Sequence, residues 1–349
     1  MIKPLIILAK LFIFCLFLVS PLLALSTPST PPVNILTWWG YLTSPWVHEM
    51  IMNQCHVNIS YDEYYTNDEF IRRFREHNTQ YDIVIFPNID YQMFAKQLTK
   101  NTSKLFENTK AYEKNVRANY EKQNYAHNVV YFQLNIEGFL WNPKVINLSD
   151  TDSISTLFKK AGSNTVVMID DPMFVYYLLN TNVENIDKMA ELKKFENLSK
   201  NSKLFLTNEL NDIYGRSDFA FAYTWPGIAI YAIDNKYKNY RYLIHPELSL
   251  ISADLLATMN NNPATVCVAN VMAGKEFLSK MQNDALYISP YKDLTSISSP
   301  TMKNFVESFF IALPKLRWQN SRVNETDFDS MDQAWKFFKL KFNNRQYTH

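Results

Sequence analysis

Short apolar runs recur along the chain, and each is followed by a segment with helical spacing. Residues 33–39 (VNILTWW) form the first run, and 44–55 (SPWVHEMIMNQC) have the Ser-Pro start of a helix. Residues 56–65 predict a second strand, 67–74 a helix and 81–86 a third strand. Alternating strands and helices predict an α/β fold with a parallel sheet covered by helices on both faces.

The middle and the last third of the chain repeat this pattern. The predicted strands are 164–169, 218–225, 240–246 and 248–259, with a hairpin-like pair at 128–135 and 137–143. The predicted helices are 153–161, 171–180, one that begins at 227, 265–281, 299–313 and 330–342. Ligands of such sheets bind at the carboxyl ends of the strands, so we expect the functional residues there.

The N-terminal segment predicts export. Residues 1–26 carry Lys3 and Lys10, an apolar run and the small-residue pattern Ala24-Leu25-Ser26, which is typical of a cleaved signal peptide. A Pro/Ser/Thr spacer at 27–32 follows. The remaining chain of about 320 residues is long enough for two domains. We predict lobe 1 at 33–130 and 253–298, lobe 2 at 131–252 and 299–349, and a periplasmic location.

Charge and composition narrow the function. Lys plus Arg (35) nearly balances Asp plus Glu (34), which argues against nucleic acid as a partner. The chain has 7 Trp, 21 Tyr and 24 Phe but only 6 Gly, so it offers flat apolar surfaces to a ligand and few phosphate-binding loops. The six His show no metal-ligand spacing and no catalytic motif is present, so we expect a binding protein without cofactor or metal, and not an enzyme.

Two cysteines, Cys55 and Cys267, remain after the predicted cleavage. Export permits a disulfide, but nothing in the sequence fixes the distance between them, and two buried free thiols are the simpler expectation. A nucleophilic cysteine is the one enzymatic alternative that stays open.

Six motifs in order give a resemblance to a known family. They are TWWGYL (37–42), YDIVIF (81–86), VVMIDDPMFVYY (166–177), AYTWPGIAI (222–230), SADLLA (252–257) and RWQN (317–320). Together they resemble the bacterial periplasmic spermidine/putrescine-binding proteins. The resemblance implies a two-lobed periplasmic binding protein fold with a hinge, a monomer that closes over its ligand, and an ABC importer permease as membrane partner.

The resemblance also implies the site. The expected ligand-binding residues are Trp38, Trp39, Tyr41, Asp171, Phe174, Trp225, Asp254 and Gln319. The aromatic rings would hold a cation, and Asp254 would supply its counter-charge, facing the ligand from a strand end. Alternatives stay open: Trp38 and Trp225 as ordinary core, Asp254 as a paired structural acid, and Asp171 as a helix N-cap before Pro172.

Three departures from the family affect the predicted ligand. Gly40 and Phe174 stand where the family has glutamates, and Ser252 replaces a tryptophan. With two acids missing, we expect a small organic cation, polyamine-like but with one cationic end and an apolar body. A periplasmic sensor subunit that serves a membrane receptor is the alternative role.

Overall fold

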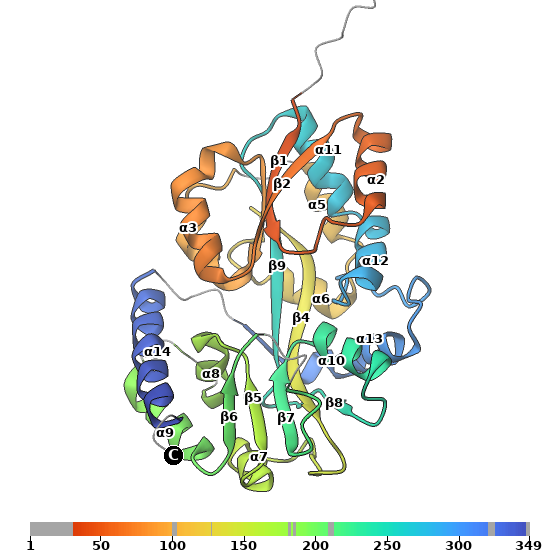
Figure 1. The fold of residues 1–349 in the computed structure, drawn as a ribbon. Coiled ribbons are helices and arrows are strands. Elements are labelled where there is room, and N and C mark those ends of the chain that lie inside the picture. Colours follow the sequence, from red (N-terminus) through yellow and green to blue (C-terminus); the bar gives the residue numbers. More distant parts are fainter. Residues whose placement is uncertain are drawn as a thin grey trace, which may run out of the picture. The chain divides into compact units, whose positions relative to one another are not determined.

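The fold comes from a computed structural model that describes residues 31–99, 103–126, 128–180, 183, 186–208, 213–319 and 325–346 (Figure 1). The predicted signal peptide, most of the spacer and Asn320 lie outside the described residues. Among the helices that are described, none combines the length and the apolarity needed to cross a membrane.

A mixed sheet of ten strands organises residues Val33–His349, in the order β2-β1-β3-β9-β4-β7-β5-β6, with β10 beside β9 and β8 beside β4. The strands are β1 (Val33–Trp38), β2 (Ile59–Tyr64), β3 (Ile83–Pro87), β4 (Val130–Trp141), β5 (Thr165–Met168), β6 (Lys203–Leu206), β7 (Phe219–Thr224), β8 (Arg241–Leu243), β9 (Leu250–Thr258) and β10 (Arg317–Trp318).

Two long antiparallel strands, β4 and β9, join the parallel parts of the sheet (Figure 1). The β1–β2 and β1–β3 pairs are parallel, as are β5–β6 and β5–β7. The prediction of a parallel sheet is therefore wrong for the centre, where β9 pairs antiparallel with both β3 and β4. The hairpin-like pair is also wrong, because Val130–Trp141 is one strand that runs unbroken through Ile136.

Helices lie along the sheet. They are α2 (Pro45–Cys55), α3 (Asn67–His77), α4 (Tyr91–Phe94), α5 (Ser103–Thr109), α6 (Lys114–Tyr120), α7 (Ile154–Ala161), α8 (Pro172–Leu179), α9 (Lys188–Ser199), α10 (Pro226–Asn235), α11 (Pro263–Met272), α12 (Lys275–Asp284), α13 (Pro300–Ala312) and α14 (Glu325–Gln346). The helices α2, α7, α8 and α13 begin directly after the predicted first residues Ser44, Ser153, Asp171 and Ser299, whereas α11 and α14 begin earlier than predicted. Short 3-10 turns cover Asn78–Gln80, Asn88–Asp90 and Leu313–Lys315.

The helix predicted at 265–281 is two helices. Gly274 lies between α11 and α12 with an extended backbone, and a side chain there would meet the carbonyl oxygen of Val271 at 3.0 Å. Glycine therefore permits the close turn that separates the two helices.

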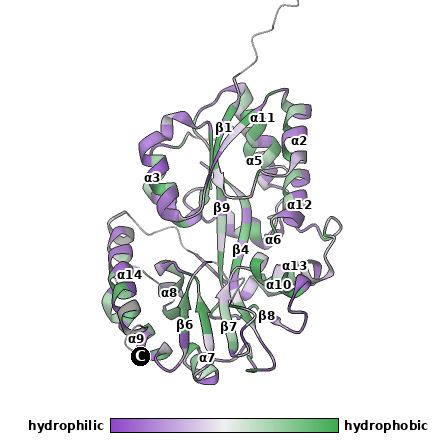
Figure 2. Cartoon of the chain, viewed as in Figure 1, coloured by the Kyte–Doolittle hydropathy of each residue, from purple (hydrophilic) through white to green (hydrophobic). Residues whose placement is uncertain are grey.

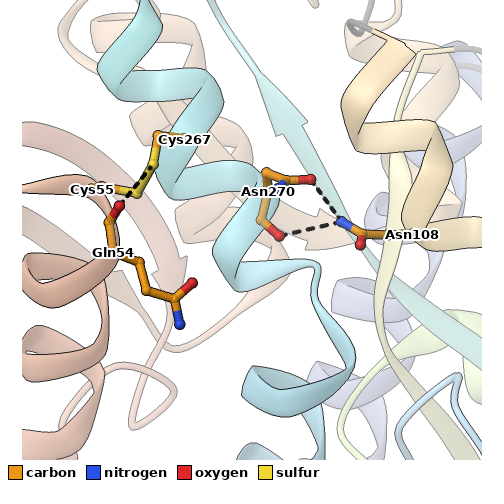
Figure 3. The surroundings of a disulfide bond; sticks show 5 residues. All are labelled: Gln54, Cys55, Asn108, Cys267 and Asn270. Atoms are coloured by element: carbon orange, nitrogen blue, oxygen red, sulfur yellow. Dashed lines mark hydrogen bonds between the residues drawn. A yellow bond between two sulfur atoms is a disulfide. The ribbon is translucent and has the colours of Figure 1, made fainter.

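The cysteines form a disulfide, so the expectation of two free thiols is wrong (Figure 3). Cys55 ends α2 and Cys267 lies in α11, with the Cα atoms 5.8 Å apart and 212 residues between them in sequence. On the other side of α11, Asn270 accepts two hydrogen bonds from the Asn108 amide of α5, at 3.0 and 3.2 Å. The disulfide also removes both thiols as catalytic nucleophiles.

The core is built from strands that are apolar on both faces. Every residue of β7 is buried, and β3 is buried up to Pro87. Figure 2 shows much of β7 in green and much of α3 in purple. Burial on both faces explains the continuous apolar runs that made the strands recognisable in the sequence.

Candidate functional site

Asp254 lies in the middle of β9, between two other strands. It pairs with Pro87 of β3 on one side and with Gln133 of β4 on the other. Its side chain is 9% exposed. The predicted strand-end position is therefore wrong, and Asp254 occupies a strand shared by both parts of the sheet.

Two neutral donors hold the Asp254 carboxylate. Trp38 at the end of β1 donates its indole N–H to Oδ1 at 3.1 Å, and the Tyr41 hydroxyl donates to Oδ2 at 2.5 Å. Burial raises the pKa of Asp254 to about 6, although the two hydrogen bonds favour the charged form. We call Trp38, Tyr41 and Asp254 the Asp254 site.

The turn that brings Tyr41 back to Asp254 depends on Gly40. Its φ of 82° lies in the left-handed region, which favours glycine, and its N–H donates to the Glu63 carboxylate of β2 at 2.8 Å. Gly40 therefore has a structural role, because its backbone conformation shapes the loop after β1.

Aromatic rings surround this carboxylate. Trp38 packs on Tyr64 with ring centroids 4.5 Å apart, and Tyr41 contacts the rings of Phe132 (5.8 Å) and Tyr287 (5.6 Å). Burial raises the pKa of Tyr41 far above its usual value, and the charge of Asp254 adds to the effect, so Tyr41 remains a donor at physiological pH.

Trp39 lies apart from the Asp254 site. It is 61% exposed and stacks on Tyr65 at 5.8 Å. Trp38 is the last residue of β1, and Trp39 lies in the turn that follows.

A second predicted group surrounds the start of α8. Asp171 caps the helix by accepting from the Met173 N–H at 2.8 Å, which confirms the N-cap alternative, and it also accepts from the Asn67 amide of α3 at 3.2 Å. Burial raises its pKa to about 6. Phe174 and Trp225 contact each other edge to face at 5.9 Å.

Gln319 follows β10 and is 4% exposed. Its backbone N–H donates to Ile251 at 2.7 Å, and its carbonyl oxygen accepts from the Asn88 amide at 3.0 Å. These bonds fix its position beside β9, next to the residues that flank Asp254.

Two buried acids were missed in the sequence. Asp90 and Glu137 are both 0% exposed, and within the described part of the chain neither Asp90 oxygen nor Glu137 Oε2 has a hydrogen-bond partner. Burial raises the pKa of Glu137 to about 8, with added repulsion from Asp171 and Asp254. Burial also raises the pKa of Asp90, followed by repulsion from Asp171, Asp68 and Asp254. Glu137 and Asp254 lie on adjacent strands, since Glu137 accepts from Ser252, two residues before Asp254.

A signal for both acids was present in the sequence. Asp90 follows the third predicted strand, at a carboxyl end where functional residues are expected. Glu137 was hidden by the hairpin prediction, which put it at the start of a second strand. As part of one strand, Gln133, Asn135 and Glu137 instead form a regular polar alternation inside an apolar segment.

None of the four carboxylates of Asp90, Glu137, Asp171 and Asp254 forms an ion pair with a residue that the structure describes. A cavity of ≈ 550 Å³ lies elsewhere, against β6 and α14, where Asp170 is paired with Lys339 at 2.8 Å. Over the described residues no group of three or more His, Cys, Asp or Glu could hold a metal ion. Among the described residues, these four buried acids therefore have no cation beside them.

No protein-family model matches the sequence, and no curated protein matches it significantly. Solved structures do. A spermidine/putrescine ABC transporter substrate-binding protein from Streptococcus pneumoniae superposes with a TM-score of 0.72 at 16% identity, covering 89% of this chain and 99% of that one.

Two other structures extend the comparison. The TpPotD lipoprotein of Treponema pallidum has a TM-score of 0.69 at 14% identity (88% and 99% covered), and maltose-bound MalE3 of T. maritima has 0.65 at 10% (88% and 99%). The chain thus has the two-lobed α/β fold of spermidine/putrescine-binding and other solute-binding proteins. The neighbours are substrate-binding transport proteins and not enzymes.

Proposed function

We propose that this chain is an extracytoplasmic solute-binding protein that captures a small organic cation for an ABC importer. The observation that carries the proposal is Asp254: a buried carboxylate held by two neutral donors, with no ion-pair partner in the described chain. An unpaired buried carboxylate is costly. A protonated amine would supply the missing charge and three N–H donors.

The aromatic residues support a cationic ligand. An ammonium group near an indole face gains about 0.5 to 2 kcal/mol. Trp38 already touches Asp254, and Trp225 with Phe174 offers a second pair of rings. We propose Trp38, Tyr41 and Asp254 as the primary contacts, with Asp171, Phe174, Trp225 and Gln319 in supporting positions and Trp39 at the rim.

The expected domain organisation fits this role. We propose that the predicted lobes hinge about β4 and β9, that a monomer closes when ligand binds, and that the N-terminal segment directs export. Scattering with and without ligand tests closure, and fractionation of the producing cell tests export. Identical scattering curves at saturating ligand would count against the hinge.

A thermal-shift screen of amines, amino acids and sugars, followed by titration calorimetry, tests the ligand class. We expect stabilisation by organic cations only. Sugars are the informative comparison, because maltose is bound by one protein of this fold. Stabilisation by neutral sugars without any amine binding would contradict the proposal.

A further inference from the structure

Elements of the two predicted lobes meet at a place that lies outside the long strands joining them. The helix α3 belongs to predicted lobe 1, and α8 and α14 belong to predicted lobe 2. Asn67, the first residue of α3, donates its amide N–H to Asp171 Oδ2 at 3.2 Å. The next residue, Asp68, has Oδ2 4.0 Å from Lys336 Nζ of α14. We call Asn67, Asp68, Asp171 and Lys336 the α3–α14 junction.

The α3–α14 junction depends on how the two lobes are arranged. Neither contact involves β4 or β9, the strands about which we propose that the lobes hinge. A hydrogen bond from an amide N–H extends to about 3.2 Å between the heavy atoms. A hinge motion that moves α3 away from α8 and α14 by a few ångströms therefore breaks both contacts. The junction stabilises the arrangement seen in this structure relative to a more open one.

The ammonium group of Lys336 serves acids of both predicted lobes. Asp332, one turn earlier on α14, lies 2.5 Å from Lys336 Nζ, and Asp68 of α3 lies 4.0 Å from the same atom. Burial raises the pKa of Asp68, the charge of Asp332 raises it further, and the charge of Lys336 lowers it. Without Lys336, two carboxylates would face each other and oppose the approach of the lobes. Lys336 thus decides whether the charges of the junction attract or repel.

Exposure limits what the pair of Asp68 and Lys336 contributes. Their side chains are 57% and 60% exposed, so water screens the attraction. An exposed pair changes an equilibrium constant by about two- to fivefold at most. That is small beside the stability of a whole fold. It is large enough to shift an equilibrium between two lobe arrangements of similar free energy.

We propose that the α3–α14 junction is an electrostatic latch, in which Asn67 and Lys336 bias the empty protein towards the arrangement with α3 against α8 and α14. This inference rests on the proposed hinge about β4 and β9. It adds a regulatory property, because salt screens the charges of Asp68 and Lys336 and so favours the open arrangement.

Distances between two spin labels measure the latch in the absence of any ligand. Thr79 of predicted lobe 1 and Asn201 of predicted lobe 2 are exposed, and each can be replaced by a labelled cysteine. Cys55 and Cys267 are bonded to each other and do not take the label. Raising the salt concentration from about 0.05 M to about 1 M should increase the ratio of open to closed protein about two- to fivefold.

Charge variants on α14 separate a latch from a simple effect on helix stability. Lys336→Gln and Asp332→Asn remove the same ion pair within α14. Lys336→Gln should raise the ratio of open to closed protein about two- to fivefold, since Asp68 then faces Asp332 without a cation. Asp332→Asn should lower the ratio, because Lys336 becomes available to Asp68. Lys341→Gln is the matched control: Lys341 pairs with Glu196 within predicted lobe 2, and the ratio should not change.

Asn67→Asp tests the other contact of the junction. It places a second carboxylate against Asp171 in a side chain of nearly the same shape, and an acid in the first turn of α3 favours the helix itself. At pH 8 Asp171 is charged, since its pKa is about 6. The ratio of open to closed protein should therefore rise at least about twofold at low salt, and less at high salt.

The signs of these shifts decide the proposal. Shifts in the same direction for Lys336→Gln and Asp332→Asn would overturn the latch. Unchanged distances in all variants, with circular dichroism showing that each is folded, would overturn it as well. No amine is present in these measurements, so either result leaves the proposed capture of an organic cation standing. Failure of the amine screen, in turn, would overturn the proposed function and leave the latch standing.

Discussion

The carboxylates near Asp254 and Asp218 at the periphery differ in whether a cation lies beside them. Asp218, next to β7, accepts from Lys203 at 2.6 Å and Arg216 at 2.9 Å, and these bonds hold its pKa below the usual range. Among the described residues, Asp254 and Glu137 accept hydrogen bonds from neutral donors only, and burial raises the pKa of both. A buried acid with a raised pKa and no neighbouring cation is a candidate for ligand binding.

The adjacent residues Asp170 and Asp171 give the same contrast within one turn. Asp170 pairs with Lys339 at 2.8 Å and accepts from the Trp335 indole at 2.8 Å. Within the described part of the chain, Asp171 accepts from neutral donors only. Of two acids adjacent in sequence, one can therefore be paired with a cation and the other not. The elements that pack beside each acid decide this.

Asp254→Asn should have the largest effect. Removing the counter-charge leaves a desolvated ligand cation unpaired, so we expect binding to weaken by about 2 to 5 kcal/mol in calorimetry. Asp218→Asn is the control and should leave affinity unchanged. If folded Asp254→Asn protein binds with wild-type affinity, Asp254 does not contact the ligand, and the contrast with Asp218 fails.

The unliganded protein should lose stability as pH rises, through Glu137. Its pKa is 4.5 when unfolded and about 8 when folded, so the folded state holds the proton more tightly. Between these values the stability of wild type, measured against Glu137→Gln, should fall by about 1.4 kcal/mol per pH unit. Chemical denaturation at a series of pH values measures the difference, and a flat difference would show that Glu137 is compensated.

The disulfide should contribute to stability without affecting binding. Replacing both cysteines by alanine, Cys55→Ala with Cys267→Ala, should lower the free energy of unfolding by about 2 to 4 kcal/mol, chiefly because the unfolded chain gains freedom. Amine affinity should stay at the wild-type value. A parallel loss of affinity would mean that α2 and α11 help to shape the ligand site.

Trp225→Ala should weaken amine binding moderately. Loss of one ring face costs about 0.5 to 2 kcal/mol for a cation. The comparison with Trp39→Ala is informative, since Trp39 is 61% exposed and stacked on Tyr65, away from Asp254. If calorimetry shows equal losses of amine affinity in the two variants, Trp39 also contacts the ligand.

We expect the smallest effect, a small loss of stability, from Asp218→Asn. Asp218→Asn removes two surface ion pairs, with Lys203 and Arg216, and such a pair is usually worth about 0.2 to 1 kcal/mol. Thermal unfolding at low and high salt measures it, and the difference from wild type should shrink as salt screens the charges. If Asp218→Asn lowers stability as much as the substitution of a buried acid does, the distinction between Asp218 and the acids near Asp254 fails.

Much of the site could be predicted, because it depends on local signals. Trp38 ends a buried strand, Tyr41 follows it, and Asp254 interrupts an apolar strand. Together with the family resemblance, these positions predicted a cationic ligand. Asp171 was predicted both as a ligand group and as an N-cap, and the cap is confirmed. The ligand contacts themselves, and the lobe boundaries, remain predictions.

The sequence alone could not place Glu137 near Asp254. Its position depends on β4 being one strand and on a register that aligns Gln133 with Asp254, which is more than a hundred residues away. Likewise, the spacing of Cys55 and Cys267 along the chain carries no information about their distance in space.

The sequence by itself predicted the α/β class and many of the strands and helices, because apolar periodicity and capping act over a few residues. The two-lobed fold and the choice of Asp254 followed from the family resemblance. Only the tertiary structure decided which acids have cations beside them. Charge compensation depends on side chains brought together by strand pairing and helix packing. Among the described residues, the lack of a cation beside Asp90, Glu137 and Asp254 results from those long-range contacts.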